Sequence, residues 1–142
     1  MDYRYGSHTV FKIQYHFVFV TKYRYQILQG DVALKVRELV RQTSNAFEIE
    51  ILKGVVSKDH VYLLVSAPPN MAPSEIIRRI KGRSSTKLFE SFPDLKKRYW
   101  GRNFWARGYF CVTSEDVTEE MIKKYLEHHF KVKGDDNFRT EG

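Results

Sequence analysis

The pattern of apolar and polar positions predicts an alternation of strands and helices in the first half of the chain. Residues 8–21 alternate and are rich in β-branched and aromatic side chains, which is typical of a strand. Apolar residues then recur at helical spacing from Gly30 to about Ala46. Two further strand patterns cover residues 48–56 and 60–66, with a short polar connection between them.

The second half continues the alternation. A second helix is expected to begin at Ser74, as its N-cap, and to end before Pro93. Residues 93–106 give no clear pattern, and residues 107–113 predict a fourth strand. Thr118 is expected to cap a last helix, whose first turn carries two glutamates where the helix macrodipole favours acids. From about Lys131 we expect a polar, mobile tail.

The order of these elements predicts the fold class. Strand–helix–strand–strand–helix–strand is the ferredoxin-like (RRM-like) βαββαβ arrangement, an α+β fold with an antiparallel sheet, and here one C-terminal helix is added. The 142 residues are enough for one core, and no repeat or linker divides them. We therefore expect a single domain over residues 1–142.

Basic residues are concentrated in one segment. The chain has 24 Lys and Arg against 17 Asp and Glu, a net charge of +7. Ten of the basic residues and only two acidic ones lie between Arg78 and Arg107, so the whole surplus sits there. Nucleic acid is the simplest partner for such a segment, and the aromatic residues that follow the charges suit base stacking. The same residues would equally form a core beneath a solvated basic surface.

Cysteine content and hydropathy limit the cellular setting. The single Cys111 excludes an intramolecular disulfide and a cysteine-only metal site, and we expect it to be a small buried apolar residue. The N-terminus has no apolar signal-peptide core, and no apolar run is long enough to span a membrane. The sequence predicts a cytoplasmic protein without a membrane partner.

Two places in the pattern carry side chains capable of chemistry. In the third strand His60 and Tyr62 share one face, opposite an apolar stripe. In the last helix Tyr125 and His129 are one turn apart on the apolar side. Taken singly, each has a structural explanation, as a surface histidine on an amphipathic strand or as a core tyrosine. A tyrosine and a histidine together on one helix stripe are less usual, and they would lie over whichever sheet face the helix packs on.

Five segments, in the same order, resemble the single-tyrosine HUH transposases of small bacterial insertion sequences, within the superfamily of REP-associated tyrosine transposases. The resemblance extends from about His8 to Phe138. Its segments are YHFVFVTKYR (15–24), DHVYLLV (59–65), KGRSS (81–85), FWARGYF (104–110) and KYLEHH (124–129).

The resemblance implies a function and a set of site residues. A transposase of this kind binds the hairpin ends of an insertion sequence and cleaves and rejoins single-stranded DNA. The nucleophile would be Tyr125, which forms a 5′-phosphotyrosine intermediate with the help of Mg²⁺ or Mn²⁺. The metal ligands would be His60, His129 and the residue at position 62. The residues expected to contact DNA are Arg78, Lys81, Arg83, Lys87 and Arg102. The family also implies a homodimer, in which one subunit's tyrosine helix serves the other's strand motif, and no small-molecule cofactor.

Tyr62 departs from the family pattern, which asks for a second histidine there. A neutral phenol is a poor ligand compared with an imidazole nitrogen. The metal site is then weakened with DNA binding kept, or Tyr62 binds the metal as a phenolate or through water, or the copy is inactive. We favour a weakened or lost metal site.

Two other functions compete with an active transposase. The first is a relative that only binds structured nucleic acid, which Tyr62 itself motivates. The second is an RNA-binding module of RRM type, because residues 107–113 begin like the strand signature of such modules. That signature fails at Phe110 and Cys111, and it gives no reason for Tyr125 and His129 on one helix face.

Overall fold

A four-stranded antiparallel sheet forms the centre of the molecule, in the order β4-β5-β3-β6. The computed structural model describes residues 5–6, 9–10, 13–98, 103–113 and 117–134, and of residues 5–6, 9–10, 98 and 129–134 it describes the backbone alone. The sheet strands are β3 (Ile13–Val20), β4 (Glu50–Val56), β5 (His60–Ala67) and β6 (Phe110–Val112). Two short strands, β1 (Tyr5–Gly6) and β2 (Thr9–Val10), pair with each other and form a separate hairpin.

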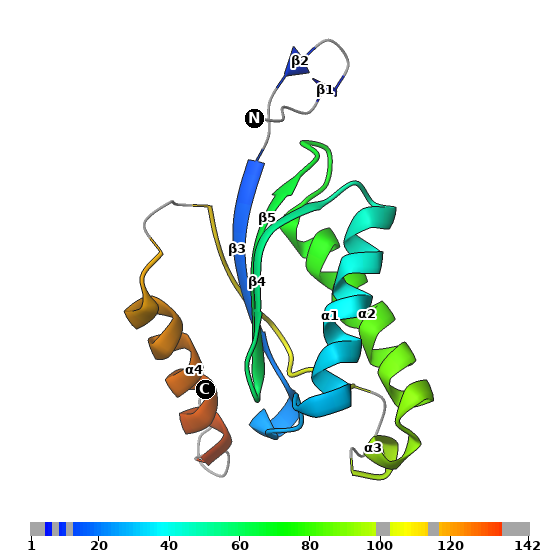
Figure 1. The fold of residues 1–142 in the computed structure, drawn as a ribbon. Helices are drawn as coiled ribbons and strands as arrows, with labels where there is room; N and C mark the ends of the chain where they lie inside the picture. The colour runs from blue at the N-terminus through cyan, green and yellow to red at the C-terminus, as the bar shows by residue number, and fades with distance from the viewer. Residues whose placement is uncertain (1–4, 7–8, 11–12, 99–102, 114–116, 135–142) are drawn as a thin grey trace.

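Helices cover both faces of the sheet. Figure 1 shows α1 (Gly30–Ala46) and α2 (Pro73–Ser91) side by side on one face, and α4 (Glu119–Gly134) alone on the other. The short helix α3 (Pro93–Arg98) follows α2, and a 3-10 turn, η1 (Lys22–Arg24), follows β3. The predicted ferredoxin-like fold with an added C-terminal helix is confirmed. No helix among the described residues is both long and apolar enough to cross a membrane.

The main core lies between the sheet and the pair α1 and α2. Alternate residues of the two central strands point into it, and Phe17, Phe19, Val61 and Val65 are all completely buried there. The helices supply Ile76, Ile80, Leu88 and Val36 to the same cluster. Because burial of this face fixes the alternation, the intervening side chains must lie on the face covered by α4.

Both early strands are shorter than the sequence predicts. The pairing of β3 with β5 ends at Ile13 opposite Ala67, and Thr9–Val10 pairs with β1 instead, so the predicted strand of residues 8–21 is divided. The strand predicted from residue 48 begins at Glu50. Glu48 has φ 59°, a left-handed conformation that does not fit into a strand.

Two helix ends differ from the predictions, the start of α2 and the end of α4, while the predicted cap of α4 is confirmed. The Ser74 cap is wrong, because α2 begins at Pro73 and its N-cap is Ala72, without a side-chain cap. Proline suits the first helical position, where its missing N–H costs nothing and its φ is already helical. Thr118 does cap α4, since its Oγ1 accepts a hydrogen bond of 3.1 Å from the Met121 N–H. Helix α4 continues to Gly134, past the predicted start of the tail at Lys131.

The segment before β6 is held against α2 by two side chains. Ser84 is fully buried, accepts a hydrogen bond from the Trp105 indole N–H at 2.9 Å and donates one to the Ile80 carbonyl at 2.6 Å. The Lys81 ammonium donates to the carbonyls of Ala106 and Gly108 at 2.7 and 2.8 Å. Gly108 belongs to the segment 107–113 that we predicted to be strand, but its carbonyl is bound by Lys81 and its φ is 76°, and β6 begins only at Phe110. Cys111 in β6 is half-buried and packs against the core.

The start of β5 is tied to the turn after β3 by Asp59. The Thr21 N–H donates to the Asp59 carbonyl at 2.9 Å. The Arg24 guanidinium binds the Asp59 carboxylate through Nε at 2.9 Å and Nη2 at 2.8 Å. The hydrogen bond from His60, together with Arg24, lowers the pKa of Asp59 in spite of its burial.

We expect Ser84→Ala to destabilise the protein. The Trp105 indole N–H would lose its acceptor in a buried position, which costs about 1–3 kcal/mol of the free energy of unfolding. Urea unfolding followed by tryptophan fluorescence measures this change. Ser74→Ala is the control, since Ser74 is exposed and caps nothing, and it should stay within about 0.5 kcal/mol of the parent. Equal stabilities for Ser84→Ala and the parent would refute the role of Ser84.

We expect Asp59→Asn to reduce stability at neutral pH by roughly 1.5–3 kcal/mol, the range for hydrogen bonds to charged groups. The folded pKa of Asp59 is lowered, so its contribution is present above the unfolded pKa of about 3.9 and is lost as pH falls through the folded value. The difference between parent and variant should therefore shrink below about pH 4. Urea titrations from pH 7 to pH 2 test this, and a difference that does not depend on pH would contradict it.

Candidate active site

The sheet face covered by α4 carries a row of polar side chains. The register pairs Val18 with Tyr62 on one side and with Phe110 on the other, so these three residues share one face. His60 pairs with Val20, and His16 pairs with Leu64, which places both histidines on the same face as Tyr62. The predicted functional face of β5 therefore lies under the tyrosine helix.

His60 is oriented by Asp59. Its Nδ1 lies 2.9 Å from Asp59 Oδ1, and both side chains are largely buried. Donation from Nδ1 leaves the Nε2 lone pair available for a metal ion, which is the arrangement seen when a carboxylate supports a ligating histidine. The geometry of His60 thus suits the role predicted for it.

Tyr62 is engaged elsewhere on the same face. Its hydroxyl lies 2.8 Å from His16 Nδ1, and the two rings are 6.0 Å apart. The register places His16 on the far side of Tyr62 from His60, so this hydrogen bond directs the phenol away from His60. Burial raises the pKa of Tyr62, which keeps the phenol protonated at neutral pH.

Tyr125 lies on α4 over this face. Its ring is 5.6 Å from the ring of Phe110, which belongs to the same row of the sheet as Tyr62. Burial raises the pKa of Tyr125 to about 12. The structure therefore places Tyr125 and His60 on the same sheet face, whereas the sequence pattern alone did not say which face the last helix covers.

Arg24 connects this face to the tyrosine helix. Arg24 Nη1 donates a hydrogen bond of 3.0 Å to the carbonyl of Leu126, the residue after Tyr125. The same guanidinium binds Asp59, the partner of His60. Helix α4 is thus held both by packing on Phe110 and by this polar contact.

The predicted metal site is only partly supported by the described side chains. Within the residues whose side chains are described, no three His, Cys, Asp or Glu groups lie close enough to hold a metal ion. His60 suits a metal ligand, whereas the Tyr62 hydroxyl is bound to His16. His129 lies in α4, but its side chain falls outside the described part of the chain.

The residues predicted to contact DNA have different surroundings. Arg78 and Arg83 are exposed on α2, where Arg78 lies 3.3 Å from Glu75 and Arg83 lies 3.4 Å from the Gln42 side chain. Lys87 is partly exposed and lies 3.6 Å from Glu90. The Lys81 ammonium is bound by two carbonyls, and desolvation lowers its pKa to about 8. Arg102 lies outside the described residues.

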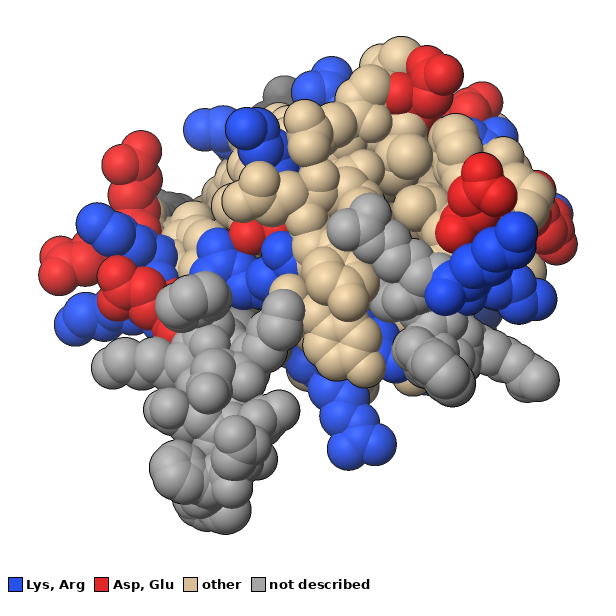
Figure 2. Space-filling model, turned by 90° about the horizontal axis from the view of Figure 1, so that it is seen from below, with Lys and Arg blue, Asp and Glu red and all other residues tan. Residues whose placement is uncertain are grey.

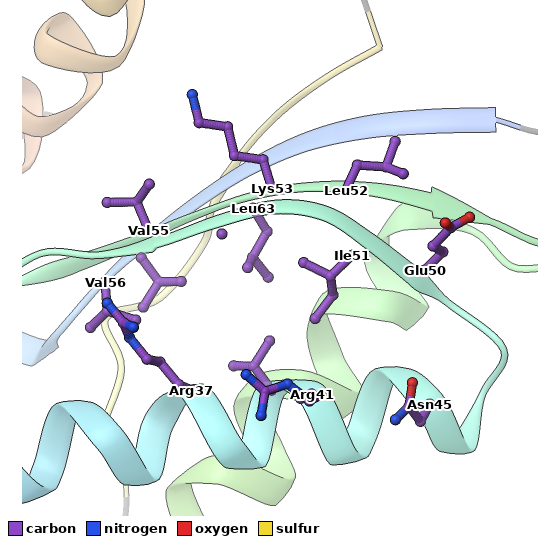
Figure 3. Close-up of a pocket in the computed structure, with 13 residues that line it drawn as sticks. Arg37, Arg41, Asn45, Glu50, Ile51, Leu52, Lys53, Val55, Val56 and Leu63 are labelled. Atoms are coloured by element: carbon purple, nitrogen blue, oxygen red, sulfur yellow. The ribbon is translucent and has the colours of Figure 1, made fainter. Parts of the chain in front are cut away.

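A groove that the sequence analysis missed lies between α1 and the edge strand β4. It encloses about 500 Å³, and Figure 3 shows Arg37 and Arg41 rising from α1 towards the strand while Ile51 points towards the helix. The charge count did not reveal these arginines because acidic residues of α1 balance them along the sequence. Only their spacing, one helical turn apart, would have placed them on one side.

Other residues of the site were also missed. Asp59 directly precedes His60, and His16 alternates with the buried Phe17, so both could have been assigned to this region from the strand pattern. Arg24 gave no such signal.

Figure 2 looks at the end of the molecule that is lowest in Figure 1, and it shows basic side chains across the middle of that end and most acidic side chains towards its two sides.

The comparisons with known proteins identify the family of this chain. The family model described as "Transposase IS200 like" matches residues 9–129. The chain is 34% identical over 122 residues to the ISDra2 transposase TnpA of Deinococcus radiodurans, covering 86% of this chain and 87% of that protein. It is 35% identical over 125 residues to the transposase for insertion sequence element IS200 of Salmonella typhimurium, covering 88% and 82%.

Solved structures give the same result. A candidate transposase from Deinococcus radiodurans R1 superimposes with a TM-score of 0.82 at 32% identity, over 89% of this chain and 97% of that chain. A REP-associated tyrosine transposase bound to a REP hairpin shares the fold at 17% identity and a TM-score of 0.55, over 82% of this chain and 61% of that chain. The family model and these relatives together show that the chain belongs to the family of IS200-like transposases.

Proposed function

We propose that this DNA transposase cuts and rejoins single-stranded DNA through a covalent bond between Tyr125 and a 5′-phosphate. The observation that carries the proposal is the position of Tyr125, whose ring packs on Phe110 over the face that also presents His60. A phenol and an oriented imidazole on one surface are the groups that such a reaction needs.

The cleavage step exchanges one phosphodiester bond for another. The Tyr125 oxygen attacks the phosphorus, a P–O bond to that oxygen forms, and the bond from phosphorus to the 3′-oxygen of the preceding nucleotide breaks. The phenol loses its proton and the departing 3′-oxygen gains one. Rejoining reverses the step with a 3′-OH from another strand end. Since the number of phosphodiester bonds is unchanged, rejoining needs no external energy source.

Activation of the phenol is the difficult part of this step. A pKa raised to about 12 means that Tyr125 is protonated at neutral pH in the absence of DNA. Transposases of the HUH type generally use a divalent metal, which polarises the phosphate and stabilises the departing oxygen. In this chain His60 fits such an ion and Tyr62, bonded to His16, does not.

The exposed cations of α2 are proposed to hold the DNA. Arg78 and Arg83 are exposed and can contact a phosphate, and Lys87 is partly exposed. The structural neighbour that is bound to a REP hairpin supports hairpin DNA as the ligand class. Lys81 is proposed to act instead as a tether for the segment before β6, since both carbonyl contacts would have to break to release its ammonium.

The family resemblance also supports a homodimer. In the single chain α4 covers its own sheet, so a dimer in which the tyrosine helices are exchanged would require α4 to leave this position. The edge strand β4 presents the exposed apolar side chains Leu52 and Val55, which a second subunit would cover.

The first test is covalent capture of DNA. We expect the parent, incubated with labelled single-stranded DNA from the ends of its own element and Mn²⁺, to give an adduct that survives a denaturing gel. Tyr125→Phe should give none, because it lacks the attacking oxygen, yet it should bind the same DNA as tightly as the parent. An adduct of undiminished yield in Tyr125→Phe would exclude Tyr125 as the nucleophile.

The second test concerns position 62. Tyr62→His adds an imidazole next to His60, and we expect Mn²⁺ to bind at least roughly tenfold more tightly, comparable to the effect of residues that support metal ligands. Binding is measured by the loss of the free Mn²⁺ signal in electron paramagnetic resonance. Tyr62→Phe is the matched control, since it removes the hydroxyl without adding a ligand, and it should bind no more tightly than the parent. If Tyr62→His binds Mn²⁺ no more tightly than the parent, position 62 does not face the metal. DNA binding without an adduct in either protein would favour a binding-only relative.

A further inference from the structure

The turn η1 contains two consecutive residues in an unfavourable backbone conformation. Tyr23 has φ 60° and Arg24 has φ 53°, which is the left-handed region that residues with a Cβ rarely adopt. Such conformations persist where surrounding contacts impose them, and they are concentrated at functional sites. Here the Thr21 hydroxyl donates to the Tyr25 carbonyl at 2.7 Å and the Arg24 N–H donates to the Thr21 carbonyl at 2.9 Å.

The conformation of the turn directs the Arg24 side chain between two elements. On one side, Nε and Nη2 bind the same carboxylate oxygen of Asp59, at 2.9 and 2.8 Å. On the other side, Nη1 binds the Leu126 carbonyl in α4 at 3.0 Å. Residues 24, 59 and 126 are far apart in sequence, so the guanidinium joins three separate parts of the chain. Arginine suits this position because its planar group presents several donors in fixed directions.

The other Asp59 oxygen is also occupied. Oδ1 lies 2.9 Å from His60 Nδ1, so one carboxylate holds both the strand histidine and the arginine. The result is a continuous chain of polar contacts from His60 through Asp59 and Arg24 to the backbone next to Tyr125. A change at either end alters the partner available to the groups in the middle.

We propose that Arg24 is a positioning residue that couples the seating of the tyrosine helix α4 to the orientation of His60. Helix α4 stays packed on the sheet while Arg24 is bound to Asp59, and its packing weakens when that ion pair is lost. Asp59 thus affects α4 through Arg24. By reciprocity, displacement of α4 releases Arg24 and weakens the hold of Asp59 on His60. This coupling would regulate the site proposed for strand transfer. Only its effect on catalysis rests on the proposed function.

Hydrogen exchange of the full-length protein, without DNA or metal, tests the coupling. In Arg24→Gln the amides of residues 122–128 should exchange about tenfold or more faster than in the parent, because a hydrogen bond from a charged group is lost. Asp59→Asn should have a similar effect on α4. The double variant should not exceed the larger single effect, since both changes break the same connection. Amides of α1 should accelerate less than those of α4, because Asp59→Asn also lowers the stability of the whole protein.

Arg79→Gln is the matched control for charge and ion-pair loss. Arg79 pairs with Glu75 at 2.7 Å and lies over the Phe47 ring at 4.2 Å, on the other side of the sheet. We expect this variant to leave exchange in α4 unchanged. Parental exchange of α4 in Asp59→Asn would overturn the proposal. So would effects of Arg24→Gln and Asp59→Asn that multiply, or equal acceleration in α1, since these indicate general destabilisation.

Arg24→Lys keeps the test valid if Arg24→Gln does not fold. A lysine ammonium is a single point donor that pairs with Asp59 or with the Leu126 carbonyl but does not span both. We expect α4 to exchange faster in this variant than in the parent. Slow, parental exchange of α4 in Arg24→Lys would mean that Arg24 does not bridge the two elements.

The consequence for catalysis is measured separately. Arg24→Lys should lower the rate of adduct formation at saturating DNA and leave the dissociation constant for hairpin DNA unchanged, because the exposed cations of α2 are untouched. If the parent forms no adduct while the exchange results hold, the proposed strand transfer is wrong and the coupling stands. If the adduct forms and exchange shows no coupling, the coupling alone is wrong.

Discussion

The alternation of side chains along β3 and β5 is the constraint on which the remaining structure depends. Phe17, Phe19, Val61 and Val65 must face α1 and α2 to be buried, and consecutive residues of a strand point to opposite faces. The side chains between them are therefore forced onto the face beneath α4. A slip of one residue in the register would bury His60 in the apolar core, so the free energy of core formation also fixes the location of the site. The apolar core and the candidate site therefore lie on opposite faces of the same two strands.

The parts of the molecule that depend on local sequence could be predicted. The periods of the apolar residues gave the order of strands and helices, and with it the ferredoxin-like topology. The same reasoning placed His60 and Tyr62 on one face and predicted the cap at Thr118, which the structure confirms. The sequence pattern left open which sheet face the last helix covers, and the structure places Tyr125 over the face of β5 that carries His60. The roles assigned to Tyr125, His60 and His129 remain proposals.

Contacts between residues distant in sequence could not be predicted. Arg24 and Asp59 are separated by 35 positions, and His16 and Tyr62 by 46. Neither pair follows from periodicity, because a hydrogen bond depends on the final orientation of two elements. Charge counting has a similar weakness, since it treats Lys81 and Arg83 alike. One is enclosed by two carbonyls and the other is exposed on the helix surface. The basic segment thus has two parts. Lys81 holds α2 to the segment before β6, whereas Arg83 belongs to the exposed surface.

The hydrogen bond between His16 and Tyr62 has an evolutionary consequence. Because each side chain supplies the other's partner beneath α4, the residues acceptable at position 62 depend on the residue at position 16. Substitution at one position removes a buried partner from the other, and the fitness effect of either change is conditional on its background. The effect of placing the second motif histidine at position 62 therefore depends on the residue at position 16.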